Sequence, residues 1–151
     1  MVDILMATYN GEAFVEEQVR SIMSQSYTDW RLLVHDDGSV DATMAIIRSL
    51  AEEDNRIVLI EDDVAHLGVA RNFIHLVGCS TAPFVMFCDQ DDVWHEDKVR
   101  KTLDLMLRTE REPEIPVLVH TDLRVVDQDL RVISPSFCQH SGLDGNRLAF
   151  R

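Results

Sequence analysis

The 151-residue sequence predicts an α/β fold with three layers (α/β/α), in which helices cover both faces of a mostly parallel sheet. Two observations support this prediction. Short and nearly continuous apolar runs, which are typical of strands buried on both faces, alternate with longer stretches whose apolar residues recur at helical spacing. Strands that alternate with helices are joined by crossover connections, and such connections place neighbouring strands parallel.

The first half of the chain contains three of the expected strands and two of the expected helices. The first helix has Val15, Val19 and Ile22 on one face, and Asp41 is a suitable N-cap for the second. In chain order we expect a strand over 2–9, a helix over 12–25, a strand over 30–37, a helix over 42–53 and a strand over 56–62.

The second half continues the alternation. In chain order we expect a helix over 68–78, a strand over 83–89, a helix over 96–109 and a fifth strand over 116–127, with which 131–134 pairs after a turn. The helix over 68–78 is expected to turn four apolar side chains inward: Val69, Phe73, Leu76 and Val77. Periodicity fades after about Ser134, so we expect 1–151 to be a single domain that is truncated and continues beyond Arg151.

Composition excludes several classes of partner. The net charge of -13 and the pI of about 4.7 argue against nucleic acid, because phosphate backbones are bound by basic surfaces. No apolar run reaches the ~20 residues of a membrane span. The three cysteines are widely spaced and are expected to be reduced, which predicts a cytoplasmic protein. The six histidines show no metal-binding motif and no close cluster, so we interpret them as structural or surface groups.

Acidic residues gather where the expected strands end. In a parallel sheet these ends meet at one edge, and ligands bind beyond that edge. Asp89 and Asp91 follow a buried strand with one residue between them, so both carboxylates can turn toward one cation. Mg²⁺ and Mn²⁺ prefer oxygen ligands of this kind. We therefore interpret Asp89 and Asp91 as a metal site, the alternative being a solvated polar loop.

Three other segments at this edge allow two interpretations each. Thr8 and Tyr9 can present backbone groups and an aromatic ring to a nucleobase, or simply form a strand-to-helix turn. Asp37, which precedes a glycine, can accept hydrogen bonds from a ligand or belong to an ordinary turn. Arg71 is a cation near an otherwise acidic edge, where a phosphate and a structural ion pair are equally suitable partners. No phosphate-binding glycine loop occurs, so a bound nucleotide would need a metal to neutralise its charge.

Taken together, these segments resemble glycosyltransferase family 2, the nucleotide-sugar transferases with the GT-A type of Rossmann-like fold. Four stretches match that family in order over roughly the first 110 residues. The finer wording of CDQDDVW and HTDLRVVD is similar to bacterial rhamnosyltransferase-like members. The four stretches are ILMATYNGEAFVEEQVRSIMSQSY, LLVHDDGSVDAT, HLGVARN and FCDQDDVWHEDKV.

The resemblance implies a role for each candidate residue. Thr8, Tyr9 and Asp37 would hold the nucleobase and its ribose, and Arg71 would help at the base. Asp89 would contact the ribose and the metal side of the donor, and Asp91 would be the main ligand of a Mg²⁺ or Mn²⁺ ion on the diphosphate.

The family also implies a reaction and its partners. The expected activity is transfer of a sugar from a UDP- or TDP-type nucleotide-diphosphate sugar to a glycan or lipid-linked acceptor hydroxyl in bacterial cell-surface polysaccharide synthesis, with inversion at the sugar. The catalytic base is expected beyond Arg151, so the chain would be mainly the donor-binding part of the enzyme, and the fragment itself inactive. We also expect self-association of an unclosed sheet. These expectations are compatible with a peripheral position of the full-length enzyme at the inner face of the membrane.

Two alternatives remain at the level of sequence. The stretch VMFCDQDDV also fits the pattern of haloacid-dehalogenase-like phosphatases, in which Asp89 would be the nucleophile and Asp91 the acid and base. That motif usually opens its fold, whereas three expected strands precede it here. The other alternative is a nucleotide-binding module without catalytic activity.

Overall fold

The computed structural model describes residues 1–110 and 116–143 of the chain. The chain divides into two compact units, Met1–Lys101 and Thr102–Arg151, and each is described by itself. No helix within the described residues is long and apolar enough to cross a membrane.

A four-stranded parallel sheet forms the centre of the first unit. β1 (Val2–Thr8) pairs with β2 on one side and with β4 on the other, and β2 pairs with β3, so the order is β3-β2-β1-β4. The predicted parallel sheet is thereby confirmed. The other strands are β2 (Trp30–Asp36), β3 (Ile57–Leu59) and β4 (Phe84–Cys88).

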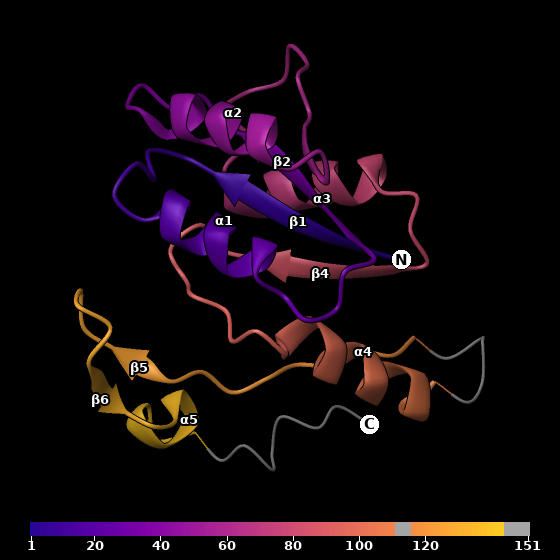
Figure 1. Ribbon diagram of the computed structural model, residues 1–151, viewed down its shortest axis with the longest axis vertical. Coiled ribbons are helices and arrows are strands. Elements are labelled where there is room, and N and C mark those ends of the chain that lie inside the picture. The colour runs from indigo at the N-terminus through magenta and orange to yellow at the C-terminus, as the bar shows by residue number, and fades with distance from the viewer. Residues whose placement is uncertain (111–115, 144–151) are drawn as a thin grey trace. The chain divides into compact units, whose positions relative to one another are not determined.

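Helices cover both faces of this sheet, which confirms the predicted three layers. Figure 1 shows α1 (Val15–Met23) and α2 (Thr43–Glu53) in front of the sheet and α3 (Val69–Cys79) behind it. Side chains alternate along each strand, so both faces of β1 and β2 are apolar and buried. On the α3 side Leu5, Leu33 and Leu76 form a buried cluster.

The inward face of α3 is narrower than expected. Leu76 is fully buried and Phe73 half-buried, but Val69 and Val77 are 71% and 44% exposed, so their predicted inward position is wrong. Asn72 takes the buried place instead, because it hydrogen-bonds to His35. The apolar periodicity alone therefore predicted the wrong buried face, because the face that packs on the sheet includes a polar residue, Asn72.

The predicted fifth strand is wrong over most of its length. Within the second unit, strand structure is confined to β5 (Val125–Val126) and β6 (Val132–Ser134), which form an antiparallel pair and confirm the predicted pairing of 131–134. A strand requires a hydrogen-bonded neighbour, and described residues 116–124 have none in the sheet, so their apolar alternation is not realised. The unit also contains α5 (Phe137–His140), while α4 (Lys98–Thr109) begins in the first unit and continues into the second.

An ion pair fixes the amino-terminal end of the sheet. Asp3 of β1 is fully buried and accepts two hydrogen bonds from the Arg31 guanidinium of β2, at 2.9 and 2.8 Å. The Ser80 hydroxyl donates a third, at 2.7 Å. Burial by itself raises the pKa of Asp3, but the bonds from Arg31 and Ser80 outweigh it and hold the pKa below its usual value. The carboxylate therefore joins β1, β2 and the segment before β4.

Candidate functional site

A cleft of about 440 Å³ opens at the carboxyl ends of the strands. The chain runs from β1 outward to β2 and β3, then crosses to β4 on the other side of β1. Ligands bind in parallel sheets at such a reversal, because the connections diverge to opposite faces and leave a crevice. The volume lies within the range of small-molecule sites. The cleft is lined by Ala7, Thr8, Tyr9, Asp37, His66, Gly68, Val69, Asn72, Phe73, Asp89, Gln90 and Asp91.

The floor of the cleft is built where β1 and β2 end. The buried Thr8 hydroxyl donates to Asp36 at 2.9 Å, and Asp36 also accepts from the backbone N–H and the hydroxyl of Ser39. The backbone N–H of Asn10 donates to the Ser39 hydroxyl at 2.8 Å. The loops after the two strands are therefore held together by side chains, and Thr8 is oriented by Asp36.

Asp37 holds the loop on the far side of the cleft. Its two carboxylate oxygens accept from the backbone N–H groups of Leu67 and Gly68, at 2.6 and 2.8 Å, and the residue is nearly buried. Gly38 follows with a φ of 93°, and a Cβ there would lie 2.8 Å from the His66 ring. Glycine is required at this position both by the backbone conformation and by the close approach of the ring.

The end of β4 supplies the opposite wall. Gln90 accepts from the backbone N–H of Tyr9 at 2.9 Å and donates to its carbonyl at 3.1 Å, so the loops after β1 and β4 are joined by one side chain. A Cβ on Gly11 would lie 2.4 Å from the Gln90 amide oxygen, so only glycine admits this contact. Asp89 and Asp91 flank Gln90 and line the cleft.

The acidic cluster after β4 carries excess negative charge. Burial raises the pKa of Asp92, the Lys98 ammonium lowers it, and the charges of Asp89 and Asp91 raise it further. Burial also lowers the pKa of Lys98, whose ammonium lies 4.6 Å from the centre of the Trp94 ring. The desolvated lysine thus interacts with the charges of Asp92 and Asp89, and a divalent cation at Asp89 and Asp91 would relieve the remaining repulsion in the cluster.

The structure brings together most of the residues singled out in the sequence. Thr8, Tyr9, Asp37, Asp89 and Asp91 all line the one cleft. Arg71 does not: its side chain is exposed on α3 and is not part of the lining.

Sequence reasoning missed four polar or aromatic lining residues: His66, Asn72, Phe73 and Gln90. Gln90 was signalled only by its place between Asp89 and Asp91. Asn72 was signalled by a polar residue at a core position of a helix, a place where a buried partner is expected.

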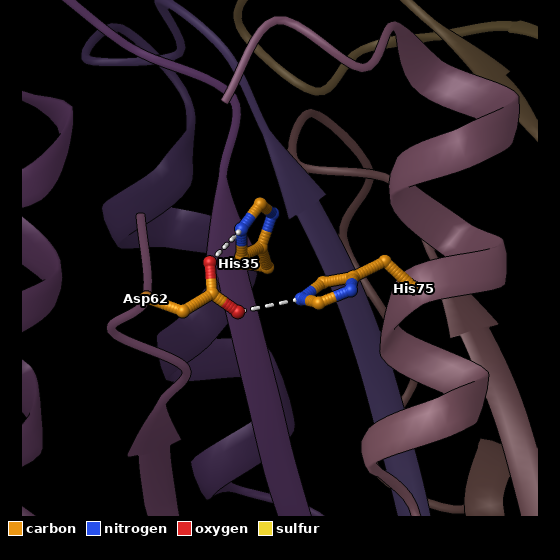
Figure 2. Close-up of side chains that lie close together, drawn as sticks. All are labelled: His35, Asp62 and His75. Carbon is orange, nitrogen blue, oxygen red and sulfur yellow. Dashed lines mark hydrogen bonds and ion pairs between the residues drawn. The ribbon is translucent and has the colours of Figure 1, made fainter. Parts of the chain in front are cut away.

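The interpretation of the histidines as unclustered is wrong. His35 of β2, Asp62 after β3 and His75 of α3 offer ligand atoms that all lie within 4.8 Å of one another. Figure 2 shows the two imidazole rings and the carboxylate pointing toward one another. Residues 27 and 13 positions apart in the sequence meet because β2, β3 and α3 are neighbours in the fold, and spacing alone did not reveal this.

Comparisons with known proteins agree on one family. The family model for glycosyl transferase family 2 matches residues 3–131. The chain is 36% identical over 106 residues to the dTDP-rhamnosyl transferase RfbG of Shigella flexneri, covering 68% of this chain and 37% of that protein. It is 32% identical over 108 residues to the UDP-Glc:alpha-D-GlcNAc-diphosphoundecaprenol beta-1,3-glucosyltransferase WfgD of Escherichia coli, covering 72% and 42%. The chain thus spans about two fifths of the length of these curated relatives.

Solved structures share the fold. S. aureus TarS residues 1–349 in complex with UDP superpose with a TM-score of 0.64 at 19% identity, covering 71% of this chain and 32% of that one. The mannosyltransferase PcManGT from Pyrobaculum calidifontis, in complex with GDP-Man and Mn²⁺, gives a TM-score of 0.61 at 25% identity, covering 68% and 31%. These similarities confirm the predicted GT-A type of fold.

Proposed function

The chain belongs to glycosyl transferase family 2, and from this membership we propose that it is the donor-binding part of an inverting, metal-dependent glycosyltransferase. The donor is a nucleotide-diphosphate sugar of UDP or TDP type. The acceptor is a hydroxyl of a glycan or lipid-linked sugar in bacterial cell-surface polysaccharide synthesis. We place the enzyme in the cytoplasm, at the inner face of the membrane where lipid-linked acceptors are found.

The observation that supports this function best is the position of two carboxylates. Asp89 and Asp91 line the cleft at the reversal of the sheet, and the chain contains no phosphate-binding glycine loop. A hard divalent cation, Mg²⁺ or Mn²⁺, suits these oxygens and would supply positive charge to the diphosphate as it leaves.

Each of the five candidate residues that line the cleft has a role in the proposal. Thr8 and Tyr9 hold the nucleobase and ribose from the β1 end, and Asp37 does so from the β2 end. Asp89 faces the ribose and metal, and Asp91 is the principal ligand. We also propose that Arg71 contacts the base. For this contact its exposed side chain has to turn toward the cleft.

The chemistry is a single displacement. A base, which we place beyond Arg151, deprotonates the acceptor hydroxyl. The oxygen attacks the anomeric carbon from the face opposite the nucleotide, the new glycosidic bond forms, and the bond to the diphosphate breaks. The electron pair leaves with the nucleoside diphosphate, whose negative charge a Mg²⁺ or Mn²⁺ ion held by Asp91 would neutralise.

The phosphatase alternative is not favoured. In that class Asp89 would lie at the first strand of the fold, whereas here it follows the fourth strand in the chain. The family match over residues 3–131 also includes this segment.

The first prediction is metal-dependent nucleotide binding. Mn²⁺ should tighten the binding of UDP or dTDP to this chain, and Asp91→Asn should lower the metal-dependent gain by about tenfold or more, as loss of a group in a metal's ligand shell does. Isothermal calorimetry with and without Mn²⁺ measures both effects.

The matched control is Asp92→Asn. It removes the same charge from the same acidic cluster, but Asp92 does not line the cleft, so the gain from Mn²⁺ should persist. Equal nucleotide affinity with and without Mn²⁺, or equal losses in the two variants, would contradict the proposed role of Asp91.

A further inference from the structure

We propose that His35, Asp62 and His75 form a second metal site, selective for Zn²⁺ and separate from the acidic pair in the cleft. The site links β2, the segment after β3 and α3 (Figure 2). It is independent of the proposed sugar transfer, because it uses none of the residues to which donor or metal binding was given above.

One of the two distances to Asp62 already fits a tetrahedral ion, and the other would have to lengthen. Ligand atoms about 2.0–2.1 Å from a tetrahedral zinc lie about 3.3–3.4 Å from one another. His35 Nε2 lies 3.4 Å from Asp62 Oδ1, which matches this spacing. His75 Nε2 lies 2.8 Å from Asp62 Oδ2, a hydrogen-bond distance that a bound ion would have to widen. Two imidazoles and one carboxylate make a set of three protein ligands, which leaves the fourth position for water.

The hydrogen bonds that His35 makes with Asn72 determine which of its two ring nitrogens carries the proton. The other nitrogen, which faces Asp62, is then the one with a lone pair. Asn72 Nδ2 donates to the His35 carbonyl at 3.2 Å, and because a carbonyl only accepts, the amide orientation is set. Asn72 Oδ1 therefore faces His35 Nδ1, at 2.8 Å, and that nitrogen must carry the proton. When the ring is neutral, its lone pair is therefore on Nε2.

That lone pair points toward a carboxylate oxygen. Two acceptors 3.4 Å apart repel unless a proton or a cation lies between them. His75 Nε2 converges on the same carboxylate, so a metal ion would satisfy both rings and Asp62 together. The contact from Asn72 to the far nitrogen of His35 is the arrangement that orients metal-binding histidines in proteins.

Ligand chemistry separates this site from Asp89 and Asp91. Imidazole nitrogen favours Zn²⁺ over Mg²⁺ and Mn²⁺, which prefer sites made of oxygen alone. Burial differs as well: His35 is 2% exposed, whereas Asp62 and His75 keep about a third and a quarter of their side chains accessible. The ion would reach the site from the Asp62 side and tie α3 to the sheet beside the cleft-lining Asn72.

The test is zinc binding by this chain, freed of metal with a chelator and held in excess Mg²⁺ to occupy the cleft carboxylates. Competition with a zinc-sensitive dye should give one tight site, and native mass spectrometry should show one retained zinc. His75→Ala and Asp62→Asn should each weaken binding by about tenfold or more. Zinc should also raise the melting temperature of the parent chain but not of these variants.

His95→Ala is the matched control, because His95 is an exposed histidine outside the cluster, and its zinc affinity should equal that of the parent. Circular dichroism checks that the variants fold, and if one does not, the other decides. The proposal is overturned if His75→Ala or Asp62→Asn, correctly folded, binds zinc like the parent. It is equally overturned if the parent chain itself binds no zinc, which would leave a metal-free hydrogen-bond network around Asp62.

Discussion

Asp37 lies at the end of β2 with both carboxylate oxygens engaged by the backbone of residues 67 and 68, while the same side chain lines the cleft. The residue that we propose to hold the nucleobase and ribose therefore also holds the loop in place. Asp37→Ala should lower the free energy of unfolding by about 2–4 kcal/mol, because two N–H groups lose a charged acceptor in a nearly buried place. Asp37→Asn keeps one acceptor oxygen and should lose less. Urea denaturation gives the values.

Asp63→Ala serves as the control for this second prediction. Asp63 is an exposed neighbour in the loop after β3, and its removal should change the free energy of unfolding by no more than about 0.5 kcal/mol. If Asp37→Ala and Asp63→Ala unfold at the same urea concentration, the bonds to residues 67 and 68 contribute nothing to stability.

Residue types that follow a strand could be foreseen as site residues from the sequence. Thr8, Asp37, Asp89 and Asp91 come directly after apolar runs, and parallel strands bring their ends to one edge, so their meeting in the cleft follows from the fold class. Gln90 could not be foreseen in this way. Its role depends on a bond to the Tyr9 backbone 81 residues away, and that contact is set by the register of β1 and β4.

At the scale of elements, prediction succeeded where local periodicity and packing agree. The four strands of the sheet and helices α1 and α2 lie within the expected ranges, and α3 extends one residue beyond its range, to Cys79. Their apolar faces pack on one another within a single unit, so the local pattern and the packing agree. The segment 116–124 has strand-like alternation but no partner strand among the described residues, so the local signal was not sufficient. Asp41 was expected to cap α2 and instead lies one residue earlier, where it accepts from the Thr43 N–H.

The third prediction concerns how the stability of the fold depends on pH. It follows from the ion pair between Asp3 of β1 and Arg31 of β2. The pKa of Asp3 in the folded chain is lower than its value in the unfolded chain, so the ionised pair stabilises the fold above the unfolded pKa. That stability is lost as the pH falls through the folded pKa. Urea midpoints of the parent should therefore fall steeply below about pH 5.

Asp3→Asn is the variant that isolates this effect. At pH 7 it should lower the free energy of unfolding by about 2–3 kcal/mol, because Arg31 loses a charged partner that accepts two of its hydrogen bonds. Between pH 5 and pH 3 its stability should change less than that of the parent. An Asp3→Asn chain whose urea midpoints run parallel to those of the parent over this range would show that the ion pair does not govern acid unfolding.

At the scale of the whole molecule, β4 is an edge strand of the sheet, and its outer edge has no neighbouring strand among the described residues. Among the described residues β4 pairs only with β1, so its second edge presents backbone groups without strand partners. Val85 and Phe87 lie on one face of β4, 37% and 52% exposed, although the Phe87 ring meets Phe73 of α3 edge to face at 5.4 Å. Exposed apolar strand edges of this kind pair with other chains.

The last prediction is that a second copy of this chain covers β4. The weight-average mass in sedimentation equilibrium should rise with concentration in the micromolar range, as two apolar faces of β4 bury one another. Phe87→Asp should hold the chain at the monomer mass, because a carboxylate placed on that face would be desolvated in the dimer.

Val40→Asp is the control: Val40 is 91% exposed and lies in the loop after β2, so this variant should associate like the parent. Circular dichroism confirms that both variants fold. A parent chain that stays monomeric at every concentration, or a folded Phe87→Asp chain that associates as strongly as Val40→Asp, would show that β4 is not the contact surface.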